Sequence, residues 1–348
     1  LMRDEAEAAR LLGLPSSFTE DVPLPFPTAG AVKFAHQAQF NPLQFLQGLA
    51  RELTIFENTR VLSVEENQLS TADAAVSADH IVFACHYPFI NFPGLYFTRM
   101  HQERSYVLAL ENAPFFDGML IDEGAGGYSF RHYGPYLLLG GGSHRTGENT
   151  GGRYDDLRRK AAEWFPQAHE AARWSAQDVI TADGVPYIGR FAARRPQWYV
   201  ATGFQKWGMT TAMAAATILR DTILEKPNPF AEVFSPSRFA ASDIPAIARE
   251  GIQAVKGLTR ENLSLPKETL DSLPVDHGGI VEFDEKKVGI YKADDSTIYV
   301  VDTRCPHLGC QLAWNPDEKT WDCPCHGSRF DFTGRLLDAP AQSDISIR

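Results

Sequence analysis

The sequence has 348 residues, of which 44% are hydrophobic and 22% charged, as in folded proteins with more than one domain. The 33 Lys and Arg against 44 Asp and Glu give a formal net charge of −11, which argues against nucleic acid or an anionic membrane surface as partner. No run approaches the roughly 18 uncharged apolar residues of a membrane helix. The N-terminus is no signal peptide, so we expect a cytoplasmic protein. Position 1 is Leu rather than Met, which indicates a part of a longer protein.

The first two thirds of the sequence alternate between predicted helices and strands. In chain order we expect a helix over 4–12, a helix from 42, strands over 55–64 and 79–84, a strand region with a hairpin over 102–139, a helix over 154–165, a strand over 198–201 and a helix over about 208–224. The stretch 81–85 is continuously apolar, as in strands that are covered on both faces. This alternation predicts an α/β or α+β domain over residues 1–225.

The remaining third has a different pattern. Residues 226–274 are rich in Pro, Ser and charged side chains, and they predict a linker with one weak helix over 244–255. Residues 275–348 show only short strands and turns, with strands expected over 279–283, 287–293 and 298–302. We therefore expect a second, small all-β domain after the linker.

Four of the five cysteines lie between positions 305 and 325, which indicates a metal site with at most one disulfide. Cys305-x-His307 and Cys323-x-x-His326 each supply one thiolate and one imidazole. Two Cys and two His can hold a structural zinc ion. They can also hold a Rieske [2Fe–2S] cluster, whose imidazole ligands raise its potential above that of all-Cys clusters.

Further residues in these two motifs favour the cluster over zinc. A zinc ribbon does not usually need Cys310, Cys325 or the Gly-Ser328 that follows the second His. Residues 275–348 resemble the Rieske domains of cytochrome bc-type proteins. The resemblance implies a Cys310–Cys325 disulfide, a Ser328 hydroxyl that donates to a bridging sulfide, and Pro340 in the loop that shields the cluster. High-potential relatives have Tyr where this chain has Phe330, which implies a lower potential here.

Residues 36–225 resemble the D-amino-acid oxidase and glycine oxidase family of FAD-dependent enzymes. The resemblance rests on Phe40-Asn-Pro42, Thr59-Arg-Val61, Ala84-Cys-His-Tyr-Pro88, Asp183-Gly-Val-Pro-Tyr-Ile-Gly189 and Ala201-Thr-Gly203-Phe-Gln-Lys-Trp-Gly208-Met-Thr210. It implies a flavin site with the contacts Val61, Gly189, Gly203, Phe204, Trp207, Gly208, Met209 and Thr210. A helix that begins near Gly208 would aim its free N–H groups and positive dipole at the flavin N1–C2=O edge. Taken without the resemblance, the same spacing also fits a glycine-capped core helix.

The sequence lacks the G-x-G-x-x-G fingerprint that binds the adenosine diphosphate part of a dinucleotide. The family places this fingerprint before the point where the sequence begins, so we expect FAD in the full-length protein. On the substrate side, Arg131 is a candidate for clamping a carboxylate, although a solvated strand residue is the alternative. Lys206 is a second catalytic candidate, because it lies beside the predicted flavin helix. We expect Cys85 to be a buried core thiol.

Two functions remain open from the sequence. The first is an oxidoreductase that passes electrons from an amine or amino-acid-like substrate through FAD to the Rieske cluster and on to an acceptor, because a flavin takes two electrons and can release them singly. The second is a Rieske electron-transfer module with a non-catalytic, FAD-free docking domain. A ring-hydroxylating oxygenase is not expected, because those enzymes have a mononuclear iron domain after the cluster and only 22 residues follow His326 in this sequence. A respiratory Rieske subunit is disfavoured, because no anchor helix is present.

Overall fold

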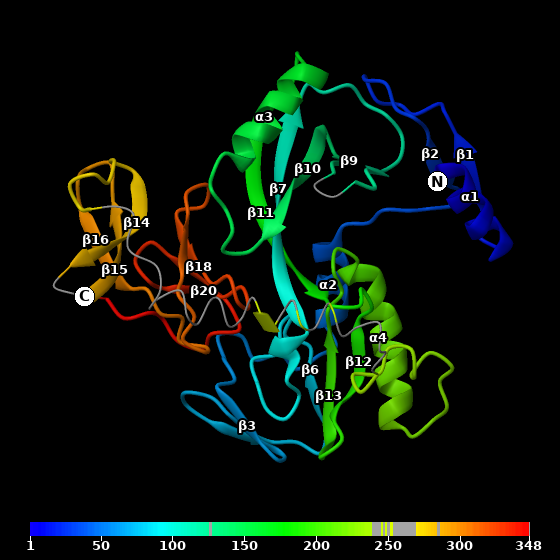
Figure 1. The fold of residues 1–348 in the computed structure, drawn as a ribbon. Coiled ribbons are helices and arrows are strands. Elements are labelled where there is room, and N and C mark those ends of the chain that lie inside the picture. Colours follow the sequence, from blue (N-terminus) through cyan, green and yellow to red (C-terminus); the bar gives the residue numbers. More distant parts are fainter. Residues whose placement is uncertain are drawn as a thin grey trace. The chain divides into compact units, whose positions relative to one another are not determined.

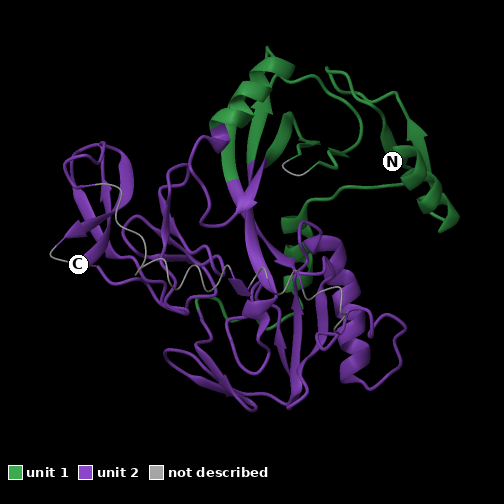
Figure 2. Ribbon diagram, viewed as in Figure 1, with its two compact units in different colours: residues 1–58, 107–141, 155–174 green, residues 59–106, 142–154, 175–348 purple. Residues whose placement is uncertain are grey.

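The structure is a computed structural model, and Figure 1 shows its fold. It describes residues 1–124, 127–238, 269–283 and 286–347, together with 245, 248, 251 and 252. These residues form two compact units, drawn in two colours in Figure 2. Unit 1 comprises residues 1–58, 107–141 and 155–174, and unit 2 comprises residues 59–106, 142–154 and 175–348. The units interleave along the chain, and the domain boundaries expected near 225 and 274 remain predictions.

Unit 1 begins with two helices and a hairpin, and the predicted helices over 4–12 and from 42 are confirmed. Helix α1 (Met2–Leu11) precedes the antiparallel pair β1 (Ser16–Thr19) and β2 (Ala31–Phe34). Helix α2 (Pro42–Ala50) begins where the Asn41 side chain accepts hydrogen bonds from the backbone N–H groups of Leu43 and Gln44, at 3.0 and 3.1 Å. Such an N-cap satisfies two groups that have no partner within the helix.

A five-stranded sheet has the order β11-β7-β10-β9-β8. The predicted hairpin at Gly134-Pro135 is confirmed, since Tyr133 pairs with Tyr136 across the turn. The predicted helix over 154–165 is confirmed as α3. The 13-residue strand β11 had no counterpart in the sequence expectations. The elements here are β7 (Met100–Glu111), β8 (Leu120–Ile121), β9 (Ser129–Tyr133), β10 (Tyr136–Arg145), α3 (Arg153–Trp164) and β11 (His169–Thr181).

Unit 2 contains a second sheet of order β12-β13-β6, in which β13 and β6 are parallel. Its strands are β6 (Ile81–Phe83), β12 (Tyr187–Ala192) and β13 (Arg195–Thr202), and helix α4 (Gly208–Ile223) packs on it through Ala215, Ile218 and Leu219. The predicted strand over 198–201 and helix over about 208–224 are therefore confirmed. The expectation that the strand near 81 is covered on both faces is wrong. Val82 is 43% exposed, because β6 turns only one face to the core of the described chain.

The predicted strand over 55–64 is wrong for most of its length. Asn58 has a left-handed φ of 55°, which breaks an extended chain. Only its end joins a small three-stranded sheet made of β3 (Ser63–Glu65), β4 (Gln68–Ser70) and β5 (Ala75–Ser77). After β6 the chain continues through the short 3₁₀ helix η1 (Tyr96–Thr98) into β7.

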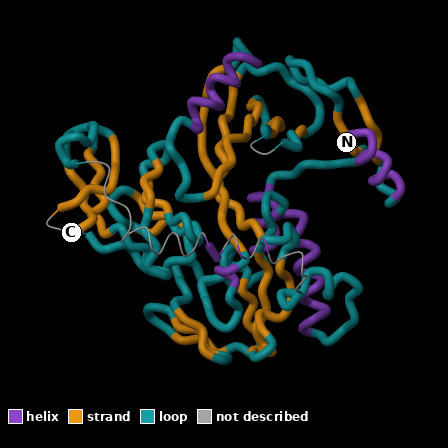
Figure 3. The backbone as a smooth tube through the Cα atoms, viewed as in Figure 1, coloured by secondary structure: helices purple, strands orange, loops and turns teal. Residues whose placement is uncertain are grey.

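Residues 277–347 of unit 2 form a small all-β part, as predicted, and within the described residues it contains only strands, turns and loops (Figure 3). A three-stranded sheet consists of β14 (His277–Phe283), β15 (Lys286–Lys292) and β16 (Ile298–Asp302). A four-stranded sheet consists of β17 (Ala313–Asn315), β18 (Thr320–Asp322), β19 (Arg329–Asp331) and β20 (Leu336–Asp338). Trp321 and Phe330 are completely buried in the core of this β-domain.

Much of the linker expected over 226–274, including most of the weak helix over 244–255, lies outside the described residues. Its first part packs on β12, where the Ile188 N–H donates to the Phe234 carbonyl at 2.8 Å and Arg238 pairs with Asp183 at 2.7 Å. Among the residues that the structure describes, no helix is both long and apolar enough to cross a lipid bilayer.

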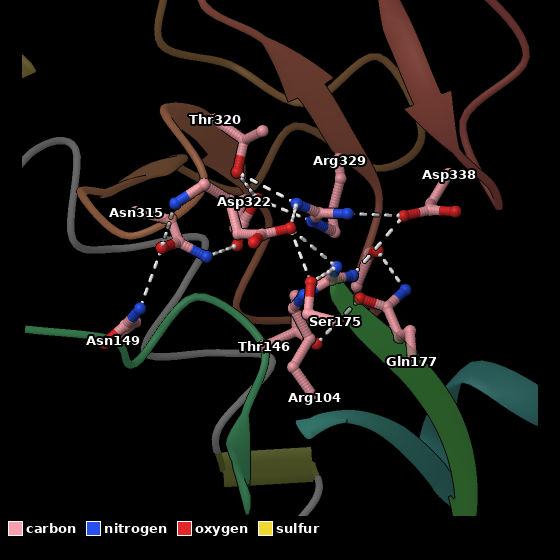
Figure 4. Close-up of polar contacts among 12 residues, drawn as sticks. Arg104, Thr146, Asn149, Ser175, Gln177, Asn315, Thr320, Asp322, Arg329 and Asp338 are labelled. Atoms are coloured by element: carbon pink, nitrogen blue, oxygen red, sulfur yellow. Dashed lines mark hydrogen bonds and ion pairs between the residues drawn. The ribbon is translucent and has the colours of Figure 1, made fainter. Parts of the chain in front are cut away.

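Two buried arginines lie close together where β7 of the five-stranded sheet contacts the β-domain (Figure 4). Arg104 on β7 is 3% exposed and lies 3.1 Å from a Glu318 carboxylate oxygen and 3.6 Å from an Asp338 oxygen. Arg329 on β19 is 5% exposed and lies 2.9 Å from the same Asp338 oxygen and 3.1 Å from an Asp322 oxygen. The carboxylates between the two guanidinium groups thus balance charges that would otherwise be costly to bury.

A second set of polar contacts lies beside this network (Figure 4). The buried Asn149 amide donates to Asn315 at 2.7 Å and to Asp317 at 2.9 Å. The Asp317 carboxylate in turn accepts from the backbone N–H groups of Gly152 and Arg153, both at 3.1 Å. Together the two sets fix the turn between β17 and β18 against the chain that follows β10.

We predict that Arg104→Met destabilises the protein by about 1.5–3 kcal/mol, since it removes the charged contacts with Glu318 and Asp338 while Arg329 still lies beside both carboxylates. The measurement is urea unfolding of the full chain. Arg159→Met is the matched control, because Arg159 is 73% exposed and pairs with Asp156 on the surface, so its loss should change little. Equal losses in the two variants would contradict a special role for the buried network.

The network also predicts a pH dependence. Burial alone would raise the pKa of Glu318, but hydrogen bonds from Ser175 and Tyr154 and the charges of Arg104 and Arg329 outweigh it, so the pKa is lowered from its usual 4.5. A depressed carboxyl pKa stabilises the fold above 4.5, and this stabilisation is lost as the pH falls through the folded pKa. Glu318→Gln should therefore be less stable than wild type at neutral pH, with a gap that narrows below pH 4.5. A gap that stays constant during acid titration would disprove this account.

Candidate redox site

Two loops of the β-domain have the same backbone pattern. In the first, between β16 and β17, the Cys305 N–H donates to the Cys310 carbonyl and the Gly309 N–H to the Cys305 carbonyl, both at 2.9 Å. In the second, between β18 and β19, the Cys323 N–H donates to the Ser328 carbonyl at 2.8 Å and the Gly327 N–H to the Cys323 carbonyl at 2.9 Å. We call residues 305–310 and 323–328 the ligand loops.

The four residues singled out as cluster ligands come together between these loops. Cys305 and Cys323 are 2% and 1% exposed, neither is in a disulfide, and their side chains are in hydrogen-bond contact, which lowers the pKa of Cys305. The Nδ1 atoms of His307 and His326 lie 3.3 Å apart. Burial lowers the pKa of His307 to about 4, so its imidazole is neutral at neutral pH and can donate a lone pair. Two thiols and two facing imidazoles fit the donor set of a Rieske [2Fe–2S] cluster.

A disulfide joins the two ligand loops. The Cys310 and Cys325 sulfurs are 2.14 Å apart, and the Cys323 sulfur lies within 4.8 Å of both. The bridge removes Cys310 and Cys325 as thiolate ligands, although these three sulfurs are close enough to form a metal site on their own. The bridge also connects the two ligand loops close to Cys323, which is one of the four candidate ligands.

Ser328, Phe330 and Pro340 surround the ligand loops. The Ser328 hydroxyl is completely buried, accepts the Ala341 N–H at 2.9 Å and hydrogen-bonds the Cys305 sulfur. Phe330 is also fully buried in the core that contains Cys305, and Pro340 is buried in the loop after β20. The roles that the sequence suggests for Ser328 and Phe330 in setting the potential remain predictions.

The second ligand loop packs tightly against β7 and the chain that follows β10. Gly147 has a φ of 81°, and a Cβ added there would lie 2.6 Å from the backbone of Pro324. Gly327 also has a φ of 81°, and a Cβ there would lie 2.7 Å from the Gln102 side chain. Only glycine permits both the left-handed backbone and this close approach. Sequence reasoning missed both contacts, because an isolated glycine carries no sign of what lies opposite.

Side-chain amides complete this contact. The Gln102 amide on β7 donates to the His326 carbonyl at 2.6 Å, and the Gln177 amide on β11 donates to the Gly327 carbonyl at 2.8 Å. The Gln102 oxygen accepts from Gln177 at 2.7 Å. Sequence reasoning missed these residues as well. A usable signal was the alternation along β7, where the buried positions 102, 104 and 106 all carry polar or hydrogen-bonding side chains.

The predicted flavin contacts lie around the start of α4 and on neighbouring segments. Gly203 follows β13 with a φ of 75°, and a Cβ there would collide with Thr181. The first residue of the helix, Gly208, has open space where a Cβ would stand, and no side chain caps the helix N-terminus. Free N–H groups on an open helix end fit the anionic edge of a flavin. Met209 and Thr210 belong to the first turn of α4, Phe204 packs beside the α4 core, and Trp207 is 60% exposed. The other two predicted contacts lie elsewhere in unit 2. Gly189 is on β12, and Val61 lines a cavity.

Two cavities lie between the end of β6 and the chain around β20. One of about 520 Å³ is lined by Val61, Phe83 and Gln342, among others, and one of about 460 Å³ by His86, Gln177 and Asp338, among others. Cys85 lines both, so the expectation of a buried core thiol is wrong. The reason is that β6 ends at Phe83, which leaves Cys85 beyond the strand and facing open space.

The two catalytic candidates belong to different units. Arg131 lies on β9 in unit 1 and donates to the Gln39 side chain at 3.0 Å. Lys206 precedes α4 in unit 2 and pairs with the Asp178 carboxylate at 2.9 Å. Each side chain therefore has a polar partner within its own unit, and its catalytic role remains a prediction.

Comparison with known proteins agrees with this geometry. Residues 2–222 match the DAO family, described as FAD dependent oxidoreductase, and residues 269–347 match the Rieske [2Fe-2S] domain. The chain is 33% identical over 354 residues to the Rieske 2Fe-2S iron-sulfur protein YhfW of Bacillus subtilis (strain 168), covering 97% of this chain and 70% of that protein. It is 41% identical over 51 residues to cytochrome b6-f complex iron-sulfur subunit 1 of Nostoc sp. (strain PCC 7120), covering 15% of this chain and 28% of that protein.

Among solved structures, glycine oxidase from Geobacillus kaustophilus has the same fold. The TM-score is 0.59 at 20% identity, over 68% of this chain and 71% of that chain. The expected fold class, an oxidoreductase domain of this type followed by a small all-β domain, is thus confirmed. The chain therefore belongs to the DAO family of FAD-dependent oxidoreductases and carries a Rieske [2Fe–2S] domain over residues 269–347.

Proposed function

We propose that this oxidoreductase takes electrons from an amine or amino-acid-like small molecule and passes them through FAD to its Rieske cluster and on to a separate acceptor. Family membership supports the redox function and both cofactors. The likeness in fold to an enzyme named glycine oxidase supports the substrate class. The proposal includes a cytoplasmic location and no nucleic-acid or membrane partner, in line with the net charge of −11.

The ligand set of the cluster is part of the proposal. Cys305, His307, Cys323 and His326 would hold the cluster, supplying the two thiolates and two imidazoles that a Rieske centre requires. Their convergence and their burial support this assignment. The Cys310–Cys325 bridge holds the ligand loops together, and Ser328 stabilises the sulfur side of the cluster through its hydrogen bond to Cys305.

The flavin site forms the second part. Gly203, Gly208, Met209 and Thr210 present backbone to the ring at the start of α4, with Phe204 and Trp207 beside it, while Val61 and Gly189 contact the rest of FAD. When bound, FAD supplies two-electron oxidation of the substrate and can release the electrons singly. Arg131 binds the substrate carboxylate, and Lys206, held by Asp178, places a positive charge near the helix end.

One observation carries the proposal. The ligand loops belong to the same compact unit as β6, β12, β13 and the first residues of β7, and the Gln102 amide binds the carbonyl of the candidate ligand His326 at 2.6 Å. A cluster held against the oxidoreductase domain is arranged to exchange electrons with it. A Rieske domain that only served an outside partner would not need buried, directed contacts of this kind.

The test is anaerobic reduction of the purified protein with a panel of amines and amino acids. We expect one class of compound to bleach the flavin absorption and then produce the EPR signal of the reduced Rieske cluster. Dithionite serves as the control that both centres can be reduced. If dithionite reduces both centres and no member of the panel reduces either, the substrate proposal is wrong. A protein that includes the dinucleotide fingerprint and still purifies without flavin would support the docking-module alternative instead.

We further predict that Cys323→Ser and His326→Ala each abolish the cluster, because one iron loses one of its two protein ligands. Iron and acid-labile sulfide analysis measures the result. Cys85→Ser is the matched control, since Cys85 lies outside the ligand loops and should leave the cluster content unchanged. Unchanged iron in either ligand variant, or zinc in place of iron in the wild-type protein, would rule out this ligand set.

A further inference from the structure

Asn91 contacts the imidazole of His307 from the FAD domain. Its side-chain oxygen lies 2.8 Å from His307 Nε2, while Nδ1 of the same ring faces His326. Asn91 lies between β6 and η1, and its carbonyl accepts the Leu95 N–H at 2.9 Å, so a turn fixes its backbone. The contact therefore joins a residue of the FAD domain to one of the candidate iron ligands.

The other imidazole is enclosed by the same segment of chain. His326 is 2% exposed. The Phe97 ring stands edge-on to it at a centroid distance of 5.8 Å, and the Tyr87 ring lies at 6.3 Å. Tyr87, Asn91 and Phe97 thus lie against the two imidazoles, and the Asn91 oxygen meets a ring nitrogen of His307.

The chemistry of the contact follows from the ligand geometry. A neutral imidazole that binds iron through Nδ1 carries its proton on Nε2, and that N–H must donate. An amide oxygen that accepts this hydrogen bond fixes the tautomer and the ring orientation, and it makes the ligating nitrogen more basic. A more basic ligand stabilises the oxidised iron more than the reduced iron, so the reduction potential falls.

We propose that Asn91 is a positioning residue for the cluster. It orients His307 through the Nε2–H···Oδ1 hydrogen bond and lowers the reduction potential of the centre. The inference rests on the proposed assignment of His307 as an iron ligand. It makes the segment between β6 and β7 the part of the FAD domain that sets the potential of the cluster.

Three variants of the full chain test the inference. Asn91→Leu keeps the approximate size and removes the acceptor, so the midpoint potential should rise. Asn91→Asp keeps an acceptor and adds negative charge, so the midpoint should fall below that of the wild type. Asn67→Leu replaces an exposed amide in the turn between β3 and β4 and should leave the midpoint unchanged.

The readout is a dithionite titration followed by EPR, together with pulsed EPR of the ligand nitrogens, which should differ between wild type and Asn91→Leu. Wild-type midpoints and spectra in both Asn91 variants at full iron and sulfide content would overturn the inference. If Asn91→Leu loses its cluster, Asn91→Asp decides alone: a lowered midpoint supports the inference, and an unchanged or raised one refutes it. The titration requires no substrate and no added flavin. A shifted midpoint potential in a protein that oxidises no substrate would therefore contradict only the proposed function.

Discussion

The ion pairs of the buried Arg104 fix the Rieske domain on strand β7 of the FAD domain, and the geometry of the redox site depends on them. Arg104 and Arg329 approach one another from different domains, with Asp338 between them and Glu318 beside both. A buried guanidinium without a carboxylate is far less stable than a paired one. The network therefore specifies a single docked arrangement, because a displaced domain would leave Arg104 buried without Glu318 and Asp338, although Arg329 would keep Asp322 within the Rieske domain.

This arrangement keeps the ligand loops in place. The loop that contains Cys323 and His326 approaches β7 and the residues after β10 so closely that glycine is needed at 147 and 327. The disulfide then carries this constraint to the first ligand loop, because it joins Cys310 to Cys325. The contact between Asn91 and His307 fixes the first loop from the FAD domain as well. Each loop is thus held at two places, by its partner loop and by the FAD domain.

The sequence alone predicted the parts of the protein that local patterns encode. Short motifs with fixed spacing marked the candidate ligands Cys305, His307, Cys323 and His326, and in the fold the two cysteines contact each other and the two histidines face each other. The N-cap residue Asn41 marked the start of a helix, which the structure shows from Pro42. Strand β11 was missed because charged and small residues interrupt its alternation, and its burial pattern is mostly exposed over its first half.

The contacts between the two domains could not be predicted, because they depend on positions far apart in the chain. Asn91 and His307 are separated by 216 residues, and Gln102 and His326 by 224. No local pattern records which side chain a distant backbone carbonyl will meet. Cys85 shows the converse: an apolar stretch predicted a buried thiol, but the strand ended two residues earlier and left the side chain facing two cavities.

The most direct test of the account is how the rate of cluster reduction, after the flavin has been reduced, depends on protein concentration. The measurement mixes the protein anaerobically with a reducing substrate, or with photoreduced flavin generated in the protein, and follows the cluster by rapid-freeze EPR at several protein concentrations. If the cluster is held on the FAD domain of its own chain, its reduction rate is independent of protein concentration. A rate that rises in proportion to concentration would show transfer between molecules and would contradict the account.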